Sequence, residues 1–430
     1  MAVAIEKSRL ISKIFFGVFW IAAVTPFFGQ EFMPSAYEKL SSPLFALIDL
    51  VLILLGAWVI KRKTDWIILI AFAGFAFAST CIINDYSILF FVNGLRLYLC
   101  YIIIVPIFRY FFSDKDRSKT FIKKMDRTLY VFLWLQLPTA VVQCILYGAY
   151  DQVGGSMGWM MSGEMSTLVY LISFYLMHKN WDSSISYFSN IKQNWILIFL
   201  LIPSFLNETK ISFVFLLMYF FFLLPMDKKF IKRLLIFFPC MMALFGVAGY
   251  FFLSITNSDT DVLTAEYFTM YFSGDDDALN FMEIAAEEGI DMVGDDQGDL
   301  FRGVKFAAIP LLHLREPHAA LVGFGVGQFK GGSSLEKSEF AKEFEWLLRG
   351  AVMGFYMVII ELGYIGFILT IIFWVIAFRG NRSNVNRQLL MYQILTVALL
   401  GVYNSSFIHP VFYLIFFYVL FINKWVGFKK

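Results

Sequence analysis

Residues 88–111 read ILFFVNGLRLYLCYIIIVPIFRYF. As a helix, this stretch is long enough to cross the hydrocarbon core of a bilayer, which takes roughly 20 mainly apolar residues. The whole chain has the same character, since 59% of its residues are hydrophobic and only 16% are charged. Soluble domains carry about a quarter charged residues, and no soluble core could bury 51 Phe side chains. The sequence therefore predicts an all-α polytopic membrane protein.

Eleven further apolar stretches accompany residues 88–111, which makes about twelve transmembrane helices. In chain order, the expected spans are 14–31, 44–60, 66–83, 88–111, 128–149, 164–178, 194–207, 211–225, 234–255, 351–377, 388–405 and 409–423. The pair within 194–225 leaves only a very tight turn between its helices. The first run has no small-x-small cleavage site after it, so we expect an uncleaved helix rather than a signal peptide.

The distribution of basic residues predicts which way these spans run. Cytoplasmic loops of membrane proteins carry an excess of Lys and Arg. If the N-terminus is cytoplasmic and the spans alternate, 25 of the 35 basic residues lie on the cytoplasmic side. Most of the others fall in one long loop, which the rule hardly counts. Both termini are therefore expected to be cytoplasmic.

One outer segment is much longer than the others and divides the chain into three parts. Spans one to nine occupy residues 1–255, a large outer loop occupies 256–350, and spans ten to twelve occupy 351–430. The loop carries 18 Asp and Glu against 7 Lys and Arg, with most of the acidic residues in its first half. Residues 278–288 and 334–349 are expected to form short amphipathic helices, the second running into the tenth span.

Among the charged residues inside expected spans, Arg96 and Glu361 are the main candidates. An Arg at mid-helix costs at least about 2.5–3.5 kcal/mol on insertion scales, so Arg96 should face the bundle interior or a wet cavity. Arg96 is then either an ion-pair partner for a neighbouring helix or an anion site for a lipid-linked phosphate. Glu361 must be paired, hydrogen-bonded or protonated, and a basic residue such as Arg96 is one candidate partner.

Charged residues at the predicted outer face form a second group of candidates. Lys210 follows Glu208 at the mouth of a helix pair, where it is either a phosphate-binding cation or a snorkelling Lys beside an acidic neighbour. The notable basic residues of the long loop are Arg302, Lys305, Arg315 and Arg349. Arg302 and Lys305 would share one helix face. Glu345 lies four residues before Arg349, the spacing of a surface ion pair.

The segment Gly323-Phe324-Gly325-Val326-Gly327-Gln328-Phe329 is glycine-rich but is no dinucleotide fingerprint, because it lacks a βαβ context. Three alternating Gly residues permit unusual backbone angles and close packing, which predicts a re-entrant or membrane-surface turn. Gly363 and Gly366 in the tenth span would allow close helix approach.

No pattern predicts a metal or cofactor site. The four Cys residues lie in apolar runs, and His313 and His318 are wrongly spaced for one helical metal face. The acidic run 275–277 is more typical of a solvated turn. We therefore expect no metal, no cofactor and no nucleic-acid partner.

The order of these features resembles the bacterial polysaccharide polymerases and O-antigen ligases of lipid-linked glycan pathways. A long outer loop lies late in a twelve-helix chain, holds Gly323-x-Gly325-x-Gly327-x-Phe329, and is followed by Glu361-x-Gly363-x-x-Gly366. A short Gly-rich segment at 154–158, followed by Ser162-Gly163-Glu164, also matches the family. The resemblance covers residues from about 85 to 375.

This resemblance implies a GT-C-like fold and glycosyl transfer at the outer face of a bacterial inner membrane. Polymerases of the family move a growing glycan from undecaprenyl diphosphate onto the next lipid-linked repeat unit, making O-antigen, capsule or exopolysaccharide. Ligases move the glycan onto lipid A core. The implied partners are the lipid-linked glycan, the bilayer, a chain-length regulator and a flippase. In the ligases, a His lies nine residues before the Glu of the last motif. In this chain Val352 occupies that position, which favours a polymerase.

The chemistry that the resemblance implies assigns roles to these candidates. A diphosphate leaving group needs fixed cations, for which the candidates are Arg96, Lys210, Arg302, Lys305, Arg315 and Arg349. The acceptor hydroxyl needs a base within hydrogen-bond reach, for which the candidates are Glu208, Glu345 and Glu361. A lipid-linked glycan flippase or other transporter stays an alternative, although transporters often show internal repeats and short outer loops.

Overall fold

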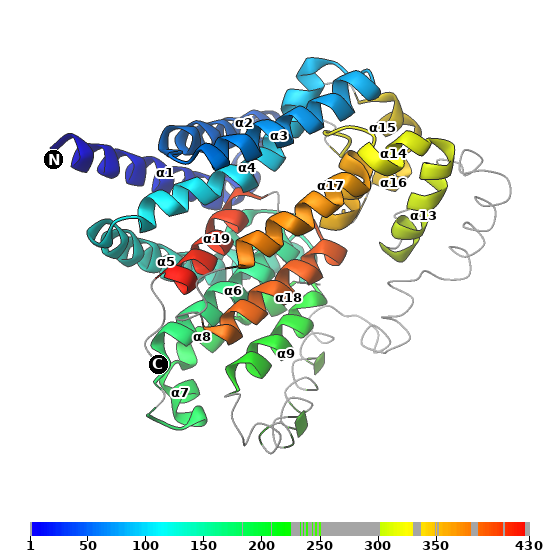
Figure 1. Ribbon diagram of the computed structural model, residues 1–430. Coiled ribbons are helices and arrows are strands. Elements are labelled where there is room, and N and C mark those ends of the chain that lie inside the picture. The colour runs from blue at the N-terminus through cyan, green and yellow to red at the C-terminus, as the bar shows by residue number, and fades with distance from the viewer. Residues whose placement is uncertain are drawn as a thin grey trace.

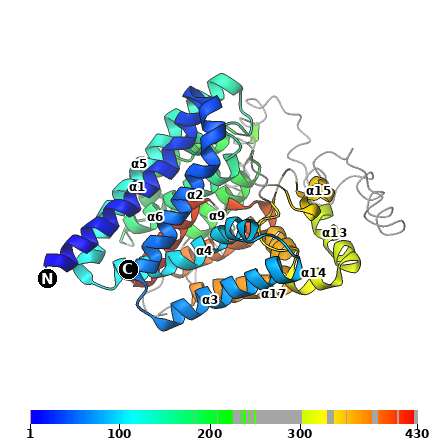
Figure 2. The same ribbon diagram turned by 90° about the horizontal axis from the view of Figure 1, so that it is seen from above.

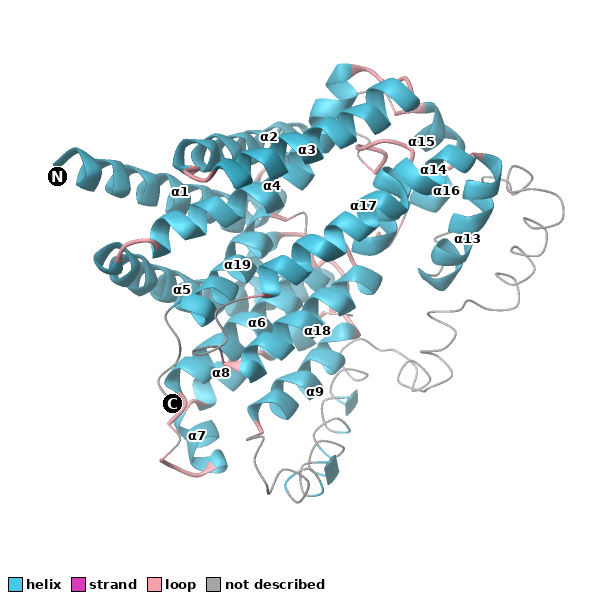
Figure 3. Ribbon diagram, in the orientation of Figure 1, coloured by secondary structure: helices cyan, strands magenta, loops and turns pink. Residues whose placement is uncertain are grey.

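The structure is a computed structural model, and it describes most of the chain. The described residues are 2–182, 184–207, 209–224, 302–329, 337–348, 350, 352–379, 386–406 and 409–425, with isolated positions between 233 and 250. Within these ranges every regular element is a helix, as Figure 3 shows. The prediction of an all-α fold is confirmed for this part of the chain.

Six helices are long and apolar enough to cross a membrane. They are α1 (Ala2–Phe32), α2 (Pro34–Val59), α3 (Lys63–Phe77) with its π-helical continuation η1 (Ala78–Ile83), α4 (Ile88–Phe112), α5 (Lys115–Tyr147) and α17 (Gly354–Phe378). These helices are consistent with a membrane-embedded protein, as the composition predicts. The arrangement of twelve spans stays a prediction.

Shorter helices complete the bundle and pack among the long ones. They are α6 (Ser162–Asn180), α7 (Tyr187–Gln193), α8 (Trp195–Phe199), the 3-10 turn η3 (Ile202–Phe205), α9 (Ile211–Leu223), α18 (Arg387–Tyr403) and α19 (Pro410–Trp425). The expectation of one continuous helix over 194–207 was wrong, because α8 ends at Phe199 and η3 follows. Pro203 in η3 has no N–H with which to continue an α-helical ladder.

The second half of the predicted outer loop is helical but interrupted. Its elements are α13 (Arg302–Arg315), α14 (Pro317–Val322), α15 (Glu339–Glu343) and α16 (Glu345–Leu348). One helix over 334–349 running into the tenth span was the wrong expectation. Gly350 adopts a φ of 67°, and Met353 is extended just before α17 begins. These two positions turn the chain between α16 and α17.

Several predictions fall outside the described residues. They concern the acidic first half of the loop with its helix at 278–288, most of the ninth span at 234–255, Glu208 and Arg349.

The two ends of the bundle differ in the segments that they gather. Figures 1 and 2 show both chain termini at one end and α13 to α16 at the opposite end. At the α13–α16 end, Asn84 Nδ2 donates to Gly323 O at 3.1 Å. The segments that share this end are those predicted to be outside. The order and orientation of the twelve spans stay a prediction.

The opposite end, where the termini lie, is held by a partly buried carboxylate. Asp126 of α5 accepts hydrogen bonds at one oxygen from Tyr175 of α6 at 2.6 Å and from Tyr418 of α19 at 2.7 Å. Lys179 of α6 forms an ion pair with its other oxygen. Three helices thus meet at one side chain, whose charge is satisfied within the protein as a low-dielectric setting requires.

Replacing Asp126 is expected to loosen this end of the bundle. Asp126→Ala leaves two buried phenols and an ammonium without their acceptor, which should cost about 2–4 kcal/mol of stability. Asp126→Asn keeps one carbonyl acceptor and should therefore lose less stability than Asp126→Ala. The melting temperature of the detergent-purified protein measures both. Asp116→Ala, which removes an exposed carboxylate of the same helix, is the control. Equal melting temperatures for all three variants would contradict this role of Asp126.

Candidate functional site

Residues 323–329, called the glycine segment below, lie between η1, α4 and α17. The N–H of Phe324 donates to Ile360 O of α17 at 2.8 Å. The N–H of Val326 donates to the hydroxyl of Thr80 in η1 at 3.0 Å. Both bonds join the segment to helices that come from distant parts of the sequence.

Glycine is required in this segment and on the helices that face it. Gly323, Gly325 and Gly327 have φ values of 75°, 85° and 105°, in the left-handed region that L side chains rarely adopt. A Cβ on Gly94 of α4 would stand 2.5 Å from the Gly327 nitrogen. The unusual angles and close packing expected from the sequence are therefore present, and α4 forms one wall of the close approach.

Gly363 allows the same close approach from α17. Its φ of 63° and ψ of −168° interrupt the helix, and a Cβ there would lie 2.5 Å from the Leu321 carbonyl group. Gly366 differs from expectation, because a Cβ there would meet Leu362 of its own helix rather than a neighbouring one. The helix break at Gly363 therefore accompanies the close approach of α17 to Leu321 in α14.

The Glu361 carboxylate joins the glycine segment to α4. Its Oε1 accepts the N–H of Gly327 at 2.9 Å and the N–H of Phe329 at 3.4 Å. Its Oε2 accepts the Tyr98 hydroxyl at 2.6 Å. The residue is 1% exposed, so both oxygens are occupied inside the protein. Glu361 is hydrogen-bonded, as one sequence alternative stated, and this geometry favours a positioning role over a catalytic one.

Arg96 has a different partner from the one suggested by the sequence. Its Nε lies 3.7 Å from Oδ2 of Asp49 on α2, and the two side chains are 13% and 4% exposed. Asp49 Oδ1 also accepts the Tyr413 hydroxyl at 3.4 Å. Arg96 therefore follows the ion-pair alternative. Asp49 lies inside an expected span, and that position was the overlooked signal for the pairing.

A second group of polar residues gathers around the first turn of α6. Asn207 is fully buried, and its Nδ2 donates to Ser166 Oγ of α6 at 3.2 Å and to Val153 O at 3.3 Å. Lys210, three residues later, directly precedes α9 (Ile211–Leu223) and is 8% exposed. The contacts of Asn207 hold the segment just before α9, in which Lys210 follows, against the start of α6.

Arg302 of α13 contacts the end of α18, which lies against the same turn of α6. Its Nε donates to Tyr403 O at 2.8 Å, and its guanidinium lies 4.4 Å from the centre of the Tyr403 ring. Asn404, the next residue, lies so close to Gly163 that a Cβ there would stand 2.9 Å from its Nδ2. The carboxyl of Glu164, next to Gly163, lies beside the Ser406 hydroxyl. We call Glu164, Lys210, Arg302, Asn404 and Ser406 the outer-end cluster.

The Gly-rich segment before α6 is also fixed from within. The N–H of Gly155 donates to Gln143 Oε1 at 2.8 Å, and the N–H of Ser156 donates to Gln136 Oε1 at 3.0 Å. Both glutamines are fully buried residues of α5. The sequence motif at 154–158 indicated this segment, whereas the two glutamines and Glu164 were not singled out as site residues.

The remaining candidates lie in surface ion pairs or on the buried face of α13. Arg315 pairs with Glu343 at 2.6 Å, and Glu345 pairs with Lys337 at 2.7 Å. All four side chains are about a third or more exposed, so these are surface ion pairs of small energetic value. Lys305 is fully buried on α13, beside the apolar face that Ala308 and Leu312 present.

His313 of α13 is the most buried imidazole near the glycine segment. Its ring packs edge-on against Tyr364, with 5.2 Å between ring centres. Burial lowers the pKa of His313 below its ordinary value. The ring is therefore neutral near pH 7, in agreement with its apolar setting.

Substitutions at Glu361 should distinguish the contribution that its hydrogen bonds make to stability from the contribution of its charge. Glu361→Ala leaves two backbone N–H groups and the Tyr98 hydroxyl unpaired in a buried site, which should cost about 3 kcal/mol or more. Glu361→Gln keeps an acceptor for Gly327 and places an amide next to the Tyr98 oxygen, so it should lose much less. Thermal melting in detergent measures both, with the surface variant Glu343→Ala as control. Two substitutions with equal effects would show that the hydrogen bonds are not what Glu361 contributes.

Comparison with known proteins adds no relative to this description. No protein-family model matches the chain, and a search of curated proteins found no match either. The function is therefore argued from the residues and their arrangement.

Proposed function

We propose that this protein is a lipid-linked glycan polymerase. It would transfer a growing glycan from undecaprenyl diphosphate to the next lipid-linked repeat unit, and so extend an O-antigen, capsule or exopolysaccharide. The observation that carries the proposal is the outer-end cluster: Asn207 joins the segment that carries Lys210 to α6, Arg302 contacts the end of α18, and Glu164 lies beside Ser406. The order of glycine motifs along the chain supports the same reaction class.

The reaction requires three things of the protein. The acceptor hydroxyl oxygen bonds to the anomeric carbon while the bond from that carbon to the diphosphate oxygen breaks. A base takes the hydroxyl proton, and the diphosphate leaves with its electron pair. Cations held in place before the reaction stabilise the charge that develops on the diphosphate.

Lys210 and Arg302 supply that positive charge in the proposal. Arg302 is held by its bond to Tyr403 O and by the Tyr403 ring, so little reorganisation is needed when an anion arrives. Lys210 is a compact charge, suited to a phosphate oxygen, and is mostly buried. Arg96 is set aside for this role because Asp49 already partners it.

Glu164 is the carboxylate that we assign as base. Among the three carboxylates predicted from sequence, Glu361 has both oxygens occupied and Glu345 lies in a surface pair. Glu164 lies in the first turn of α6, beside Ser406 in the cluster. Glu208, two residues before Lys210, is the alternative base and lies outside the described residues.

The position of the cluster agrees with transfer at the outer face. It lies at the end of the bundle that holds α13 to α16, opposite both chain termini (Figure 1). The positive-inside rule assigns the termini to the cytoplasm. The proposed location is therefore the outer face of a bacterial inner membrane, with the flippase and chain-length regulator of the pathway as partners.

Val352 favours the polymerase over the ligase. It packs against an apolar group that includes Leu95 and Met357, where the family's ligases carry a His. An imidazole would have to find a polar partner in that setting. The ligase and the transporter remain outcomes of the test below.

The test is the length of the surface glycan made by variants in the native host. Lys210→Ala with Arg302→Ala, and separately Glu164→Gln, should reduce polymerisation by about 10²–10³-fold, leaving mainly single repeat units on the acceptor. Gel electrophoresis of the glycan measures this at matched protein levels. Lys210→Arg, which keeps the charge, should retain longer chains than Lys210→Ala.

Arg315→Ala is the matched control, because it removes a basic residue of the same segment from a surface pair. It should leave chain length normal. Normal long chains in the double variant at normal expression would refute the proposed role of the cluster. In a deletion strain, intact polymer left on the carrier would indicate a ligase, and repeat units trapped on the cytoplasmic leaflet would indicate a transporter.

A further inference from the structure

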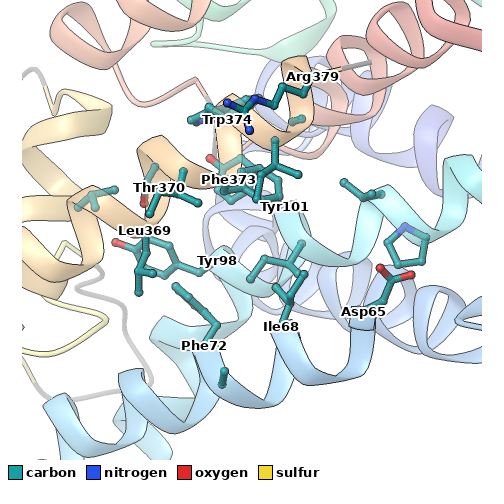
Figure 4. A pocket seen from close by; sticks show the side chains of 18 of the residues that line it. Asp65, Ile68, Phe72, Tyr98, Tyr101, Leu369, Thr370, Phe373, Trp374 and Arg379 are labelled. Carbon is teal, nitrogen blue, oxygen red and sulfur yellow. The ribbon is translucent and has the colours of Figure 1, made fainter. Parts of the chain in front are cut away.

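A cleft of about 760 Å³ separates α3 and α4 from α17 and α19, as Figure 4 shows from close by. Its deeper walls are buried apolar and aromatic groups, among them Tyr98, Val358 and Trp374. Its rim is also apolar but open, since Ile68, Leu369 and Ile376 are 47%, 40% and 56% exposed. Such a rim on helices of membrane-spanning length faces lipid rather than water.

All the cations that line the cleft lie at one end of it. Arg62 precedes α3, Arg109 lies in the last turn of α4, Arg379 follows α17, and Lys424 lies in the last turn of α19. These helix ends belong to the end of the bundle where the termini lie. The basic residues of these ends are among those that the positive-inside rule assigns to the cytoplasm.

The positive charge at this mouth is only partly neutralised from within. Arg109 forms an ion pair with Asp65 of α3. Asp65 is the sole carboxylate among the described residues that line the cleft, against four cations. On the facing wall, the Lys424 ammonium donates to the backbone oxygen of Arg379 at 3.0 Å, which adds no negative charge. The mouth therefore carries an excess of three positive charges.

We propose that this cleft binds an anionic glycerophospholipid of the cytoplasmic leaflet. The phosphate would lie between the Arg62 and Arg109 wall and the Arg379 and Lys424 wall, where guanidinium groups can donate paired hydrogen bonds to it. The acyl chains would lie along the apolar walls toward Tyr98. Basic pockets between transmembrane helices on the cytoplasmic side are suited to such headgroups.

The geometry separates this lipid from the proposed glycan carrier. The outer-end cluster lies at the opposite end of the bundle, so a carrier with its diphosphate among Arg62 and Arg379 could not present its glycan there. The lipid site therefore stands independently of the proposed reaction. Its occupant fills the gap between α4 and α17, which otherwise face each other across an apolar cleft.

The experiment measures lipid binding to the full-length protein, delipidated in detergent, by native mass spectrometry. The probes are phosphatidylglycerol, the zwitterionic phosphatidylcholine and a polyprenyl phosphate, each titrated separately. Wild-type protein should bind phosphatidylglycerol most tightly. The double variant Arg62→Ala/Arg379→Ala should bind phosphatidylglycerol roughly 10–30-fold more weakly. Each basic residue near an anionic headgroup changes the affinity by about three- to fivefold, and the variant removes two.

Two further variants sharpen the test. Lys61→Ala/Lys63→Ala removes the same charge from exposed residues that flank Arg62 but do not line the cleft, and should bind as wild type. Ala71→Trp fills the cleft without changing charge and should also weaken binding. Equal binding of phosphatidylcholine, a stronger preference for polyprenyl phosphate, or wild-type affinity in both Arg62→Ala/Arg379→Ala and Ala71→Trp would overturn the proposal.

Discussion

The hydrogen bonds of the Glu361 carboxylate are the interaction on which the α13–α16 end of the structure depends. Non-helical backbone at membrane depth is tolerated only where the protein itself satisfies its N–H and C=O groups. The glycine segment meets this condition because Glu361 accepts the N–H groups of Gly327 and Phe329, while Tyr98 donates to the same carboxylate. The backbone N–H groups thus stabilise the buried carboxylate. The carboxylate in turn gives these N–H groups the acceptor that water would otherwise supply.

This connection has consequences for the proposed site. The glycine segment directly follows α13 and α14 in the chain. Arg302, the first residue of α13, contacts the end of α18. At the start of α17, the N–H of Gly354 donates to Asn404 O at 3.0 Å. The glycine segment and the outer-end cluster are therefore joined through α13, α14 and the start of α17.

Much of the fold follows from the sequence, because hydrophobicity in a bilayer is a strong constraint on helix length and direction. The expected span at 88–111 matches α4 almost residue for residue, and the expected span at 351–377 begins only three residues before α17. The glycines at 323, 325 and 327 were also informative, since positive φ and close approach have few other solutions. Local patterns of this kind are readable without knowing what packs against them.

The partners of the buried charges were not readable in the same way. Arg96 is joined to Asp49 from α2, and Glu361 is joined to main-chain groups that carry no sequence signal. Both contacts depend on which helix faces lie together, which periodicity does not determine when helices are apolar on all sides. The same limit explains why Glu164 and the excess charge at Arg62 and Arg379 emerged only with the helices in place.

The central claim is that the glycine segment is held inside the bundle by the Glu361 carboxylate. Hydrogen exchange of the protein in lipid nanodiscs, followed by mass spectrometry of peptides covering 322–329, tests it most directly. The account predicts that the amides of Gly327 and Phe329 exchange as slowly as those in the middle of α17, because local opening would require breaking buried bonds. Exchange at the rate of an exposed loop would contradict the account.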